Sequence, residues 1–405
     1  MSLNFNKVKR MLSFILLSLI VFFTACAKRE HFNLFDPAFT STEDIVIPET
    51  TKIIDNEDWE KQLISISSDS TEIYIKSSIK KKYNIRKNDI LISSNGEGLL
   101  RKVTSVADLD SIVVAVTEPA TLTEAVRDGA RQFEFTLSDL QIKRIINYRP
   151  GVALKTNLVS KKEEDMINLV LDVILYDSDG SSSTTNDQVK IVGDFYINPT
   201  ITGKFKISDW SVKKLEFGAE IKEKLNLELV ATIASLNWSN EVKLADIEFH
   251  NIIVWLGNIP VIITPILEIN AGADVDFDKK MTVGIKQELD YNLGVRYENK
   301  QWLNYSTLEE KFQYDEPNLY SNLTARAFIK PVLKLKVYGE ISTKYYGERY
   351  ELLEADNAKD PWWELYTGVK FGISVNRKIW DKALTGYEKE IIAPPPVKLA
   401  DAGGY

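Results

Sequence analysis

The sequence predicts an all-β protein in which a small N-terminal β domain precedes a large antiparallel β-sandwich or elongated β-roll. Long segments after residue 131 alternate apolar and polar residues, as in "INLVLDVILYD", and a period of two is typical of strands with one buried face. Turn signals such as "DSDGSSSTTNDQ" separate these segments, and helical spacing is rare among them. The two observations together favour antiparallel sheets over a helical or mixed fold.

The first 25 residues have the three parts of a secretory signal peptide. A basic segment with three cations precedes a thirteen-residue apolar run, Met11 to Phe23, and a small-residue stretch follows. The run is shorter than the roughly 20 residues that a membrane-spanning helix needs. Removal of residues 1–25 is therefore predicted, and it changes the formal net charge from −8 to −11 because the segment contains no acidic residue.

The only cysteine of the chain, Cys26, directly follows that stretch. Phe23-Thr24-Ala25-Cys26 resembles the lipobox of bacterial lipoproteins, in which the signal is cut before an acylated cysteine, although Leu is commonest where Phe23 stands. The resemblance implies a lipid anchor at Cys26 that attaches the protein to the outer membrane, on its surface or its periplasmic face. A buried or incidental cysteine is the alternative. No disulfide can form within the chain, so its stability depends on its core.

Residues 26–44 lack periodicity and are predicted to be a flexible tether. Residues 45–131 are predicted to form the small β domain, because short β segments such as "EIYIK" and "SIVVAVTEP" alternate with turn signals. A single short helix is expected at "TLTEAVRDG", where Thr121 or Thr123 can cap it and Gly129 can end it.

Three segments of this region, "NDILISS", "GLLRKVTSV" and "TEPATLTEAV", resemble an N-terminal module of large, mostly uncharacterised bacterial surface and secreted proteins. The resemblance covers less than a quarter of the chain. The module has no established catalytic residues, so the resemblance implies a location rather than a chemistry. The abundance of Lys, Ile and Asn, together with the lipoprotein signal, resembles envelope proteins of Bacteroidota.

Residues 132–392 are predicted to form the large antiparallel domain. Its long β segments include "KFKISDWSVKKLEFGAEI" and "VLKLKVYGEIS". The most apolar stretch, residues 252–269, is expected to be a buried strand, turn and strand rather than a membrane span, because Pro260 and Pro265 remove backbone donors inside it. Residues 393–405, "APPPVKLADAGGY", are expected to be a disordered tail.

Enzymatic chemistry has few candidate residues in this sequence. The two histidines are His31 in the tether and His250 in a predicted strand, and the motifs of serine hydrolases, P-loops and dinucleotide-binding folds do not occur. We therefore predict no cofactor and no catalysis. The alternative is a secreted polysaccharide hydrolase with paired carboxylates, since the chain contains 58 acidic residues. The negative net charge argues against a nucleic-acid partner.

Two acidic clusters are candidate calcium sites, because Ca²⁺ prefers several carboxylate oxygens. Asp177 and Asp179 precede a glycine and are interpreted first as a turn. Asp274, Asp276 and Asp278 alternate with apolar residues, which is typical of a strand with a solvated face. No metal site is predicted, and calcium at either cluster stays an open alternative.

Asp360-Pro361-Trp362-Trp363 interrupts the alternation near the C-terminus and is followed by Glu364. Proline favours a loop or a strand entrance, and adjacent tryptophans in a strand point to opposite faces. At least one indole is therefore expected to be exposed beside acidic hydrogen-bond acceptors, an arrangement suited to a sugar or to a protein side chain. The sequence thus predicts a lipid-anchored envelope protein with a binding or structural role, in adhesion or in glycan or protein binding, with Asp360, Trp362, Trp363 and Glu364 at the ligand site.

Overall fold

The computed structural model describes residues 45–155, 166–314 and 322–402. Strands account for 68% of the structure and helices for 7%, so the all-β prediction is confirmed. The predicted signal peptide and tether, with Cys26 and His31, lie outside the described residues. Within the described part, no helix is both long enough and apolar enough to cross a membrane.

The small N-terminal domain is a mixed sheet with two short helices. Its strand order is β1-β4-β5-β6-β3-β2, and the pairing of β1 with β4 is parallel. The elements are β1 (Thr51–Ile53), α2 (Asn56–Gln62), β2 (Leu63–Ile66), β3 (Glu72–Lys76), α3 (Ser77–Tyr83), β4 (Ile90–Ser93), β5 (Leu99–Leu109) and β6 (Ile112–Pro119).

The prediction of a single helix in this region is wrong. Both α2 and α3 pack against the sheet, and each buries one large side chain, Trp59 and Ile79 respectively. The expected helix is present as α4 (Leu122–Ala125), where a capping box joins Thr121 and Glu124. It is only one turn long, because the chain returns to an extended conformation at Val126.

Two large antiparallel sheets follow. The first large sheet consists of β7 (Gly129–Thr136), β9 (Val152–Leu154), β10 (Ile167–Asp177), β11 (Gln188–Ser208), β12 (Ser211–Ala231), β16 (Met281–Glu298) and β17 (Gln301–Tyr314). The second large sheet consists of β8 (Ile142–Asn147), β13 (Leu236–Phe249), β14 (Ile252–Leu256), β15 (Ile259–Phe277), β18 (Leu323–Val337), β19 (Glu340–Ala355), β20 (Trp363–Val375), β21 (Tyr387–Ile392) and β22 (Val397–Asp401). Two short 3₁₀-helices are η1 (Asp139–Gln141) and η2 (Arg377–Ile379).

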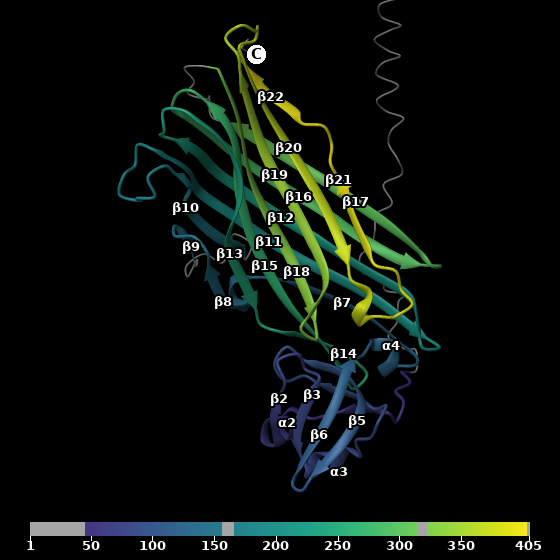
Figure 1. Cartoon of the computed structure of the whole chain (residues 1–405). Helices are drawn as coiled ribbons and strands as arrows, with labels where there is room; N and C mark the ends of the chain where they lie inside the picture. Colours follow the sequence, from purple (N-terminus) through teal and green to yellow (C-terminus); the bar gives the residue numbers. More distant parts are fainter. Residues whose placement is uncertain (1–44, 156–165, 315–321, 403–405) are drawn as a thin grey trace, which may run out of the picture. The chain divides into compact units, whose positions relative to one another are not determined.

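The two large sheets pack face to face as a sandwich (Figure 1). Inward-facing residues alternate with outward-facing ones along β12, where Leu225, Leu227 and Leu229 are buried and the residues between them are exposed. Across the sandwich, the rings of Tyr291 on β16 and Phe371 on β20 stack with centroids 4.0 Å apart. The apolar face of each sheet is thus covered by the other, which is the usual way for such sheets to bury their cores.

Turns divide two segments that the sequence presented as continuous alternation. β11 and β12 form a hairpin through Asp209 and Trp210, and both residues have positive φ. β18 and β19 form another through Tyr338 and Gly339, again with positive φ at both positions. Two-residue turns of this kind match the twist of the paired strands.

The ends of the large domain also differ from the predicted boundaries. The predicted start at residue 132 falls inside β7, which pairs with β11. The tail prediction for residues 393–405 is wrong for its described part, because β22 pairs with β20 and satisfies backbone groups along that strand. The apolar stretch 252–269 forms β14, a turn and part of β15, as expected.

The small domain contacts the large one through the loop before β5. Gly98 has φ +85°, and a Cβ there would lie 2.8 Å from side-chain atoms of both Ile262 and Tyr338. Only glycine fits this approach. Beside it, Lys336 pairs with Glu97 at 3.2 Å, so apolar and charged contacts fix the same loop.

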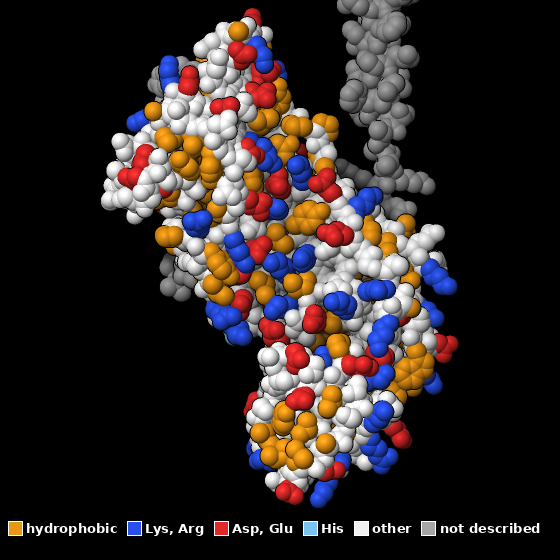
Figure 2. Space-filling model, viewed as in Figure 1, with side chains coloured by type: hydrophobic (Ala, Val, Ile, Leu, Met, Phe, Trp, Pro, Cys, Tyr) orange, Lys and Arg blue, Asp and Glu red, His pale blue; other side chains and the backbone are white. Residues whose placement is uncertain are grey.

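The outward face of the second large sheet places opposite charges on neighbouring strands. Lys334 lies 2.7 Å from Glu268, and Lys243 lies 2.8 Å from the same carboxylate. These hydrogen bonds outweigh the opposing effect of burial and lower the pKa of Glu268 to about 2. Figure 2 shows basic and acidic side chains interspersed over the visible face of the molecule.

Candidate functional site

The loop between β19 and β20 carries the tryptophan pair that the sequence singles out. Trp363 begins β20 and is only 8% exposed. Trp362 precedes the strand and is half-buried, and it packs against the main core. Asp360 is exposed in the same loop. Trp362 is therefore the indole that can offer a ring face to a ligand, whereas Trp363 belongs to the core.

An open cleft of about 460 Å³ lies beside Trp362. It brings together two sequence motifs that are far apart in the chain, the "DVDFDKK" segment at the end of β15 and the "PWW" segment before β20. Asp360 is not among the residues that line it. The polar lining consists of Asp276, Asp278, Asn322, Thr324, Glu354, Asp356, Lys359 and Glu364.

The cleft is strongly acidic. Five carboxylates line it, and Lys359 is the single cation among the described lining residues. A concave surface lined by one sign of charge raises the local concentration of oppositely charged ligands and repels those of its own sign. The cleft therefore suits a neutral or positively charged ligand that donates hydrogen bonds.

Glu364 is the best-anchored carboxylate of the cleft. Lys398 on β22 donates to one of its oxygens at 3.0 Å, and the Tyr366 hydroxyl donates to the other at 2.9 Å. The hydrogen bond from Lys398, followed by that from Tyr366, lowers the pKa of Glu364. Glu364 therefore stays ionised and acts as a hydrogen-bond acceptor at neutral pH.

Backbone contacts fix the position of Trp362. The Asp356 N–H donates to the Trp362 carbonyl at 2.7 Å, which closes the loop. The Asp356 carboxylate accepts the backbone N–H of Ala358 at 3.0 Å. On the other side, the Ala402 N–H donates to the Trp363 carbonyl at 3.0 Å. The sequence does not predict this last hydrogen bond, because it predicts a disordered tail over residues 393–405.

The two calcium candidates have different surroundings. Asp177 and Asp179 lie with Asp187 so that one oxygen of each falls within 4.8 Å of the others. Their carboxylates already accept hydrogen bonds within the loop, including the Gly180 N–H at 3.1 Å on Asp177, so a turn accounts for the cluster. In the other candidate, Asp274 pairs with Arg326 on the outward face, while Asp276 and Asp278 line the cleft.

His250 does not lie in a strand, in contrast to the prediction. It occupies the short connection between β13 and β14, where its side chain is exposed and its backbone N–H donates to the Gln141 carbonyl at 2.9 Å. β13 ends at Phe249 and β14 begins at Ile252. The alternating pattern of the sequence therefore continues past the end of the strand.

A second group of polar side chains lies between the two large sheets, and sequence reasoning missed it. Arg349 on β19 pairs with Glu223 on β12 at 2.7 Å, and each side chain is 2% exposed. The Tyr291 hydroxyl donates to the other Glu223 oxygen at 2.7 Å. Nearby, the Thr367 hydroxyl donates to Glu351 at 3.0 Å. Burial raises the pKa of Glu351 to about 8, so this carboxyl is largely protonated at neutral pH.

Comparison with protein families, with curated proteins and with solved structures finds no match for this chain.

Proposed function

We propose that this protein is a lipid-anchored component of the bacterial cell envelope that binds a saccharide in the acidic cleft beside Trp362, without catalysis. The half-buried Trp362 ring at the edge of the cleft is the observation that carries the proposal. Aromatic rings stack on the apolar faces of sugars, and carboxylates accept hydrogen bonds from sugar hydroxyls. The excess of carboxylates favours a neutral sugar or an amino sugar over an anionic polysaccharide.

Replacement of Trp362 by Ala is expected to weaken saccharide binding by about tenfold or more, because the stacking surface is lost. Calorimetric titration with cellopentaose, chitopentaose and a glucosamine pentamer measures this. Trp255→Ala is the matched control, since Trp255 is 50% exposed on β14 and does not line the cleft. Equal affinities in the two variants, or no binding of any of the three sugars by the unaltered protein, would contradict the proposal.

A polysaccharide hydrolase is the second candidate, and the five carboxylates of the cleft favour it. A glycosidase needs a carboxyl whose pKa is raised so that it can donate a proton. Among the carboxyl groups of the described residues, the pKa is raised for Asp89, Glu310 and Glu351. None of these three residues lines the cleft. We therefore prefer binding to hydrolysis. Shortened products, detected by mass spectrometry after incubation with the same sugars, would reverse this preference.

Replacement of Cys26 by Ser is expected to move the protein from the membrane fraction to the soluble fraction. Stable membrane attachment requires more than one acyl chain, and the lipobox-like segment supplies them only through Cys26. Detergent partitioning of the two proteins, expressed in a bacterium that processes lipoproteins, measures the effect. Unchanged partitioning of the Cys26→Ser protein would refute the anchor and leave the cleft proposal untouched.

A further inference from the structure

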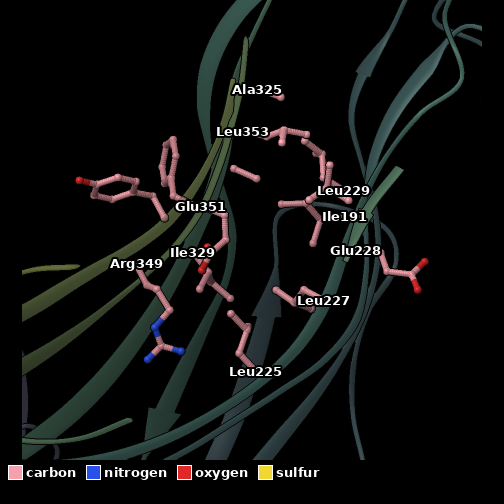
Figure 3. A pocket seen from close by; sticks show the side chains of 14 residues that line it. Ile191, Leu225, Leu227, Glu228, Leu229, Ala325, Ile329, Arg349, Glu351 and Leu353 are labelled. Atoms are coloured by element: carbon pink, nitrogen blue, oxygen red, sulfur yellow. The ribbon is translucent and has the colours of Figure 1, made fainter. Parts of the chain in front are cut away.

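A cavity lies between the two large sheets, close to the buried Arg349–Glu223 pair. Figure 3 shows the labelled leucines and isoleucines pointing toward one another from opposite sheets, while Glu228 points away. Leucines and an isoleucine of β11 and β12 form one side, and small or aliphatic residues of β18 and β19 form the other. The apolar lining residues that face the cavity include Ile191, Leu225, Leu227, Leu229, Ala325, Ile329 and Leu353.

The cavity is a narrow slot. The space free of protein atoms is about 520 Å³ when the open side of the slot is included. Only about 40 Å³ of it can be occupied by the centre of a water molecule. Little of this space is as wide as a water molecule, so it favours a thin, unbranched ligand over a ring system. An unbranched hydrocarbon chain fits it best, because the chain makes close contacts with both apolar walls.

Polar side chains at this part of the sandwich have unpaired atoms. Arg349 uses Nη2 in the ion pair with Glu223, while its Nε and Nη1 have no hydrogen-bond partner among the described residues. The same holds for Oε2 of Glu351 and for both amide atoms of Gln287, which is 2% exposed. An unpaired buried polar group costs about 1–3 kcal/mol. Several of them together point to a bound partner molecule.

Gln287 extends the polar group toward the edge of the first large sheet. It lies on β16 opposite Leu225, a residue that lines the cavity. It also shares the inward face of β16 with Tyr291, which lies four residues along the strand. The head of a ligand in the slot can therefore meet polar groups from both sheets.

The unpaired atoms are mainly donors. Arg349 and the Gln287 amide offer N–H groups, and protonated Glu351 offers an O–H. A complementary head group must therefore be rich in acceptor oxygens. Because Glu223 already balances the charge of Arg349, an uncharged carboxylic acid or an ester adds no uncompensated charge to the interior.

We propose that the slot between the two large sheets binds one unbranched acyl chain, whose carboxyl or ester head contacts Arg349 and Gln287. This site is separate from the cleft beside Trp362 and does not depend on the saccharide proposal. It gives the sandwich a lipid ligand from either of two sources, a free fatty acid or an acyl ester.

Displacement of a fluorescent fatty-acid analogue tests the site. The mature chain carries Cys26→Ser, so that its own acyl groups do not compete, and the competing ligands are palmitic acid, monopalmitoylglycerol and hexadecyltrimethylammonium. We expect the acid, the ester or both to displace the analogue, and the cation, which has no acceptor oxygen, to do so more weakly. Displacement by the acid alone identifies a fatty acid, and displacement by the ester alone identifies an acyl ester.

Two variants locate the ligand. Leu227→Trp fills the slot and is expected to abolish binding, whereas Asn226→Trp, on the outward face of the same strand, leaves it unchanged. Gln287→Leu removes one head contact and is expected to weaken binding about tenfold. If Leu227→Trp does not fold, Ala325→Leu fills the slot from the opposite sheet. Undiminished binding by the filled variant, no binding by the parent protein, or equal binding of the cation overturns the proposal.

Discussion

Replacement of Arg349 by Met is expected to lower the free energy of unfolding by about 3–5 kcal/mol, because it leaves the Glu223 carboxylate buried without a counter-charge. The two groups lie 2.7 Å apart across the sandwich, and each is 2% exposed. The Tyr291 hydroxyl is the other partner of Glu223, and one neutral donor cannot replace a guanidinium cation. Urea denaturation of the variant and its parent measures the loss.

A second substitution shows whether the unpaired charge causes that loss. Glu223→Gln in the Arg349→Met background removes the charge and keeps an acceptor for Tyr291, so most of the stability should return. Arg144→Met is the control, since Arg144 forms a two-pronged pair with Glu248 but is 60% exposed. Its loss should stay below about 1 kcal/mol. Similar losses at the buried and the exposed pair would contradict the argument.

The fold class follows from the sequence because the strands are long. β10 coincides with the alternating segment "INLVLDVILYD", and its alternate apolar residues from Ile167 to Leu175 are buried in one core. The turns were harder to place. Asp209 and Trp210 form a tight hairpin turn without glycine, so nothing in their composition separates β11 from β12. Only the pairing partners along both strands fix the turn there.

The small domain shows the limit of periodicity for short helices. α3 has seven residues and a single buried side chain, Ile79, so it contains too little of an apolar stripe to be recognised. Two of its lysines pair with acids of the same domain, as Lys80 does with the exposed Asp108 at 2.6 Å. The charge pattern was therefore informative about exposure but not about secondary structure.

The buried polar group could have been recognised in part. Arg349 and Glu351 alternate in phase with Tyr345 and Leu353 on β19, so the period of two places both charged side chains on the apolar face. The partner, Glu223, lies 126 residues earlier in the chain, and no local pattern joins the two. Pairs at this separation depend on how the two sheets pack, which alternation alone does not determine.

The sequence predicts part of the Trp362 cleft. The sequence singled out Trp362, Trp363 and Glu364, and separately Asp276 and Asp278, and the structure places all five residues around one cleft. Asp360 is exposed outside it. β22 pairs along β20 directly after Trp363, and the Ala402 N–H donates to the Trp363 carbonyl. A proline-rich C-terminal segment gave no indication of that strand, because prolines are depleted in strands.

Replacement of Glu351 by Gln is expected to make the protein more stable at alkaline pH and to leave its stability unchanged near pH 4. Burial raises the pKa of Glu351 from 4.5 to about 8. Between these values the folded protein keeps a proton that the unfolded chain has released, so each unit of rising pH lowers the free energy of unfolding by about 1.4 kcal/mol. The contribution of the Glu351 carboxyl to the free energy of unfolding is fully present below pH 4.5 and is lost by pH 8. The total loss is up to about 5 kcal/mol. Glu351→Gln keeps an acceptor for the Thr367 hydroxyl and has no proton to lose.

Urea denaturation at pH 4, 6, 7, 8 and 9 should therefore give curves for parent and variant that diverge as the pH rises. Glu340→Gln, at an exposed position of the same strand, is the control and should follow the parent. A constant difference between Glu351→Gln and the parent across this range would show that the Glu351 carboxyl is not held protonated between the sheets.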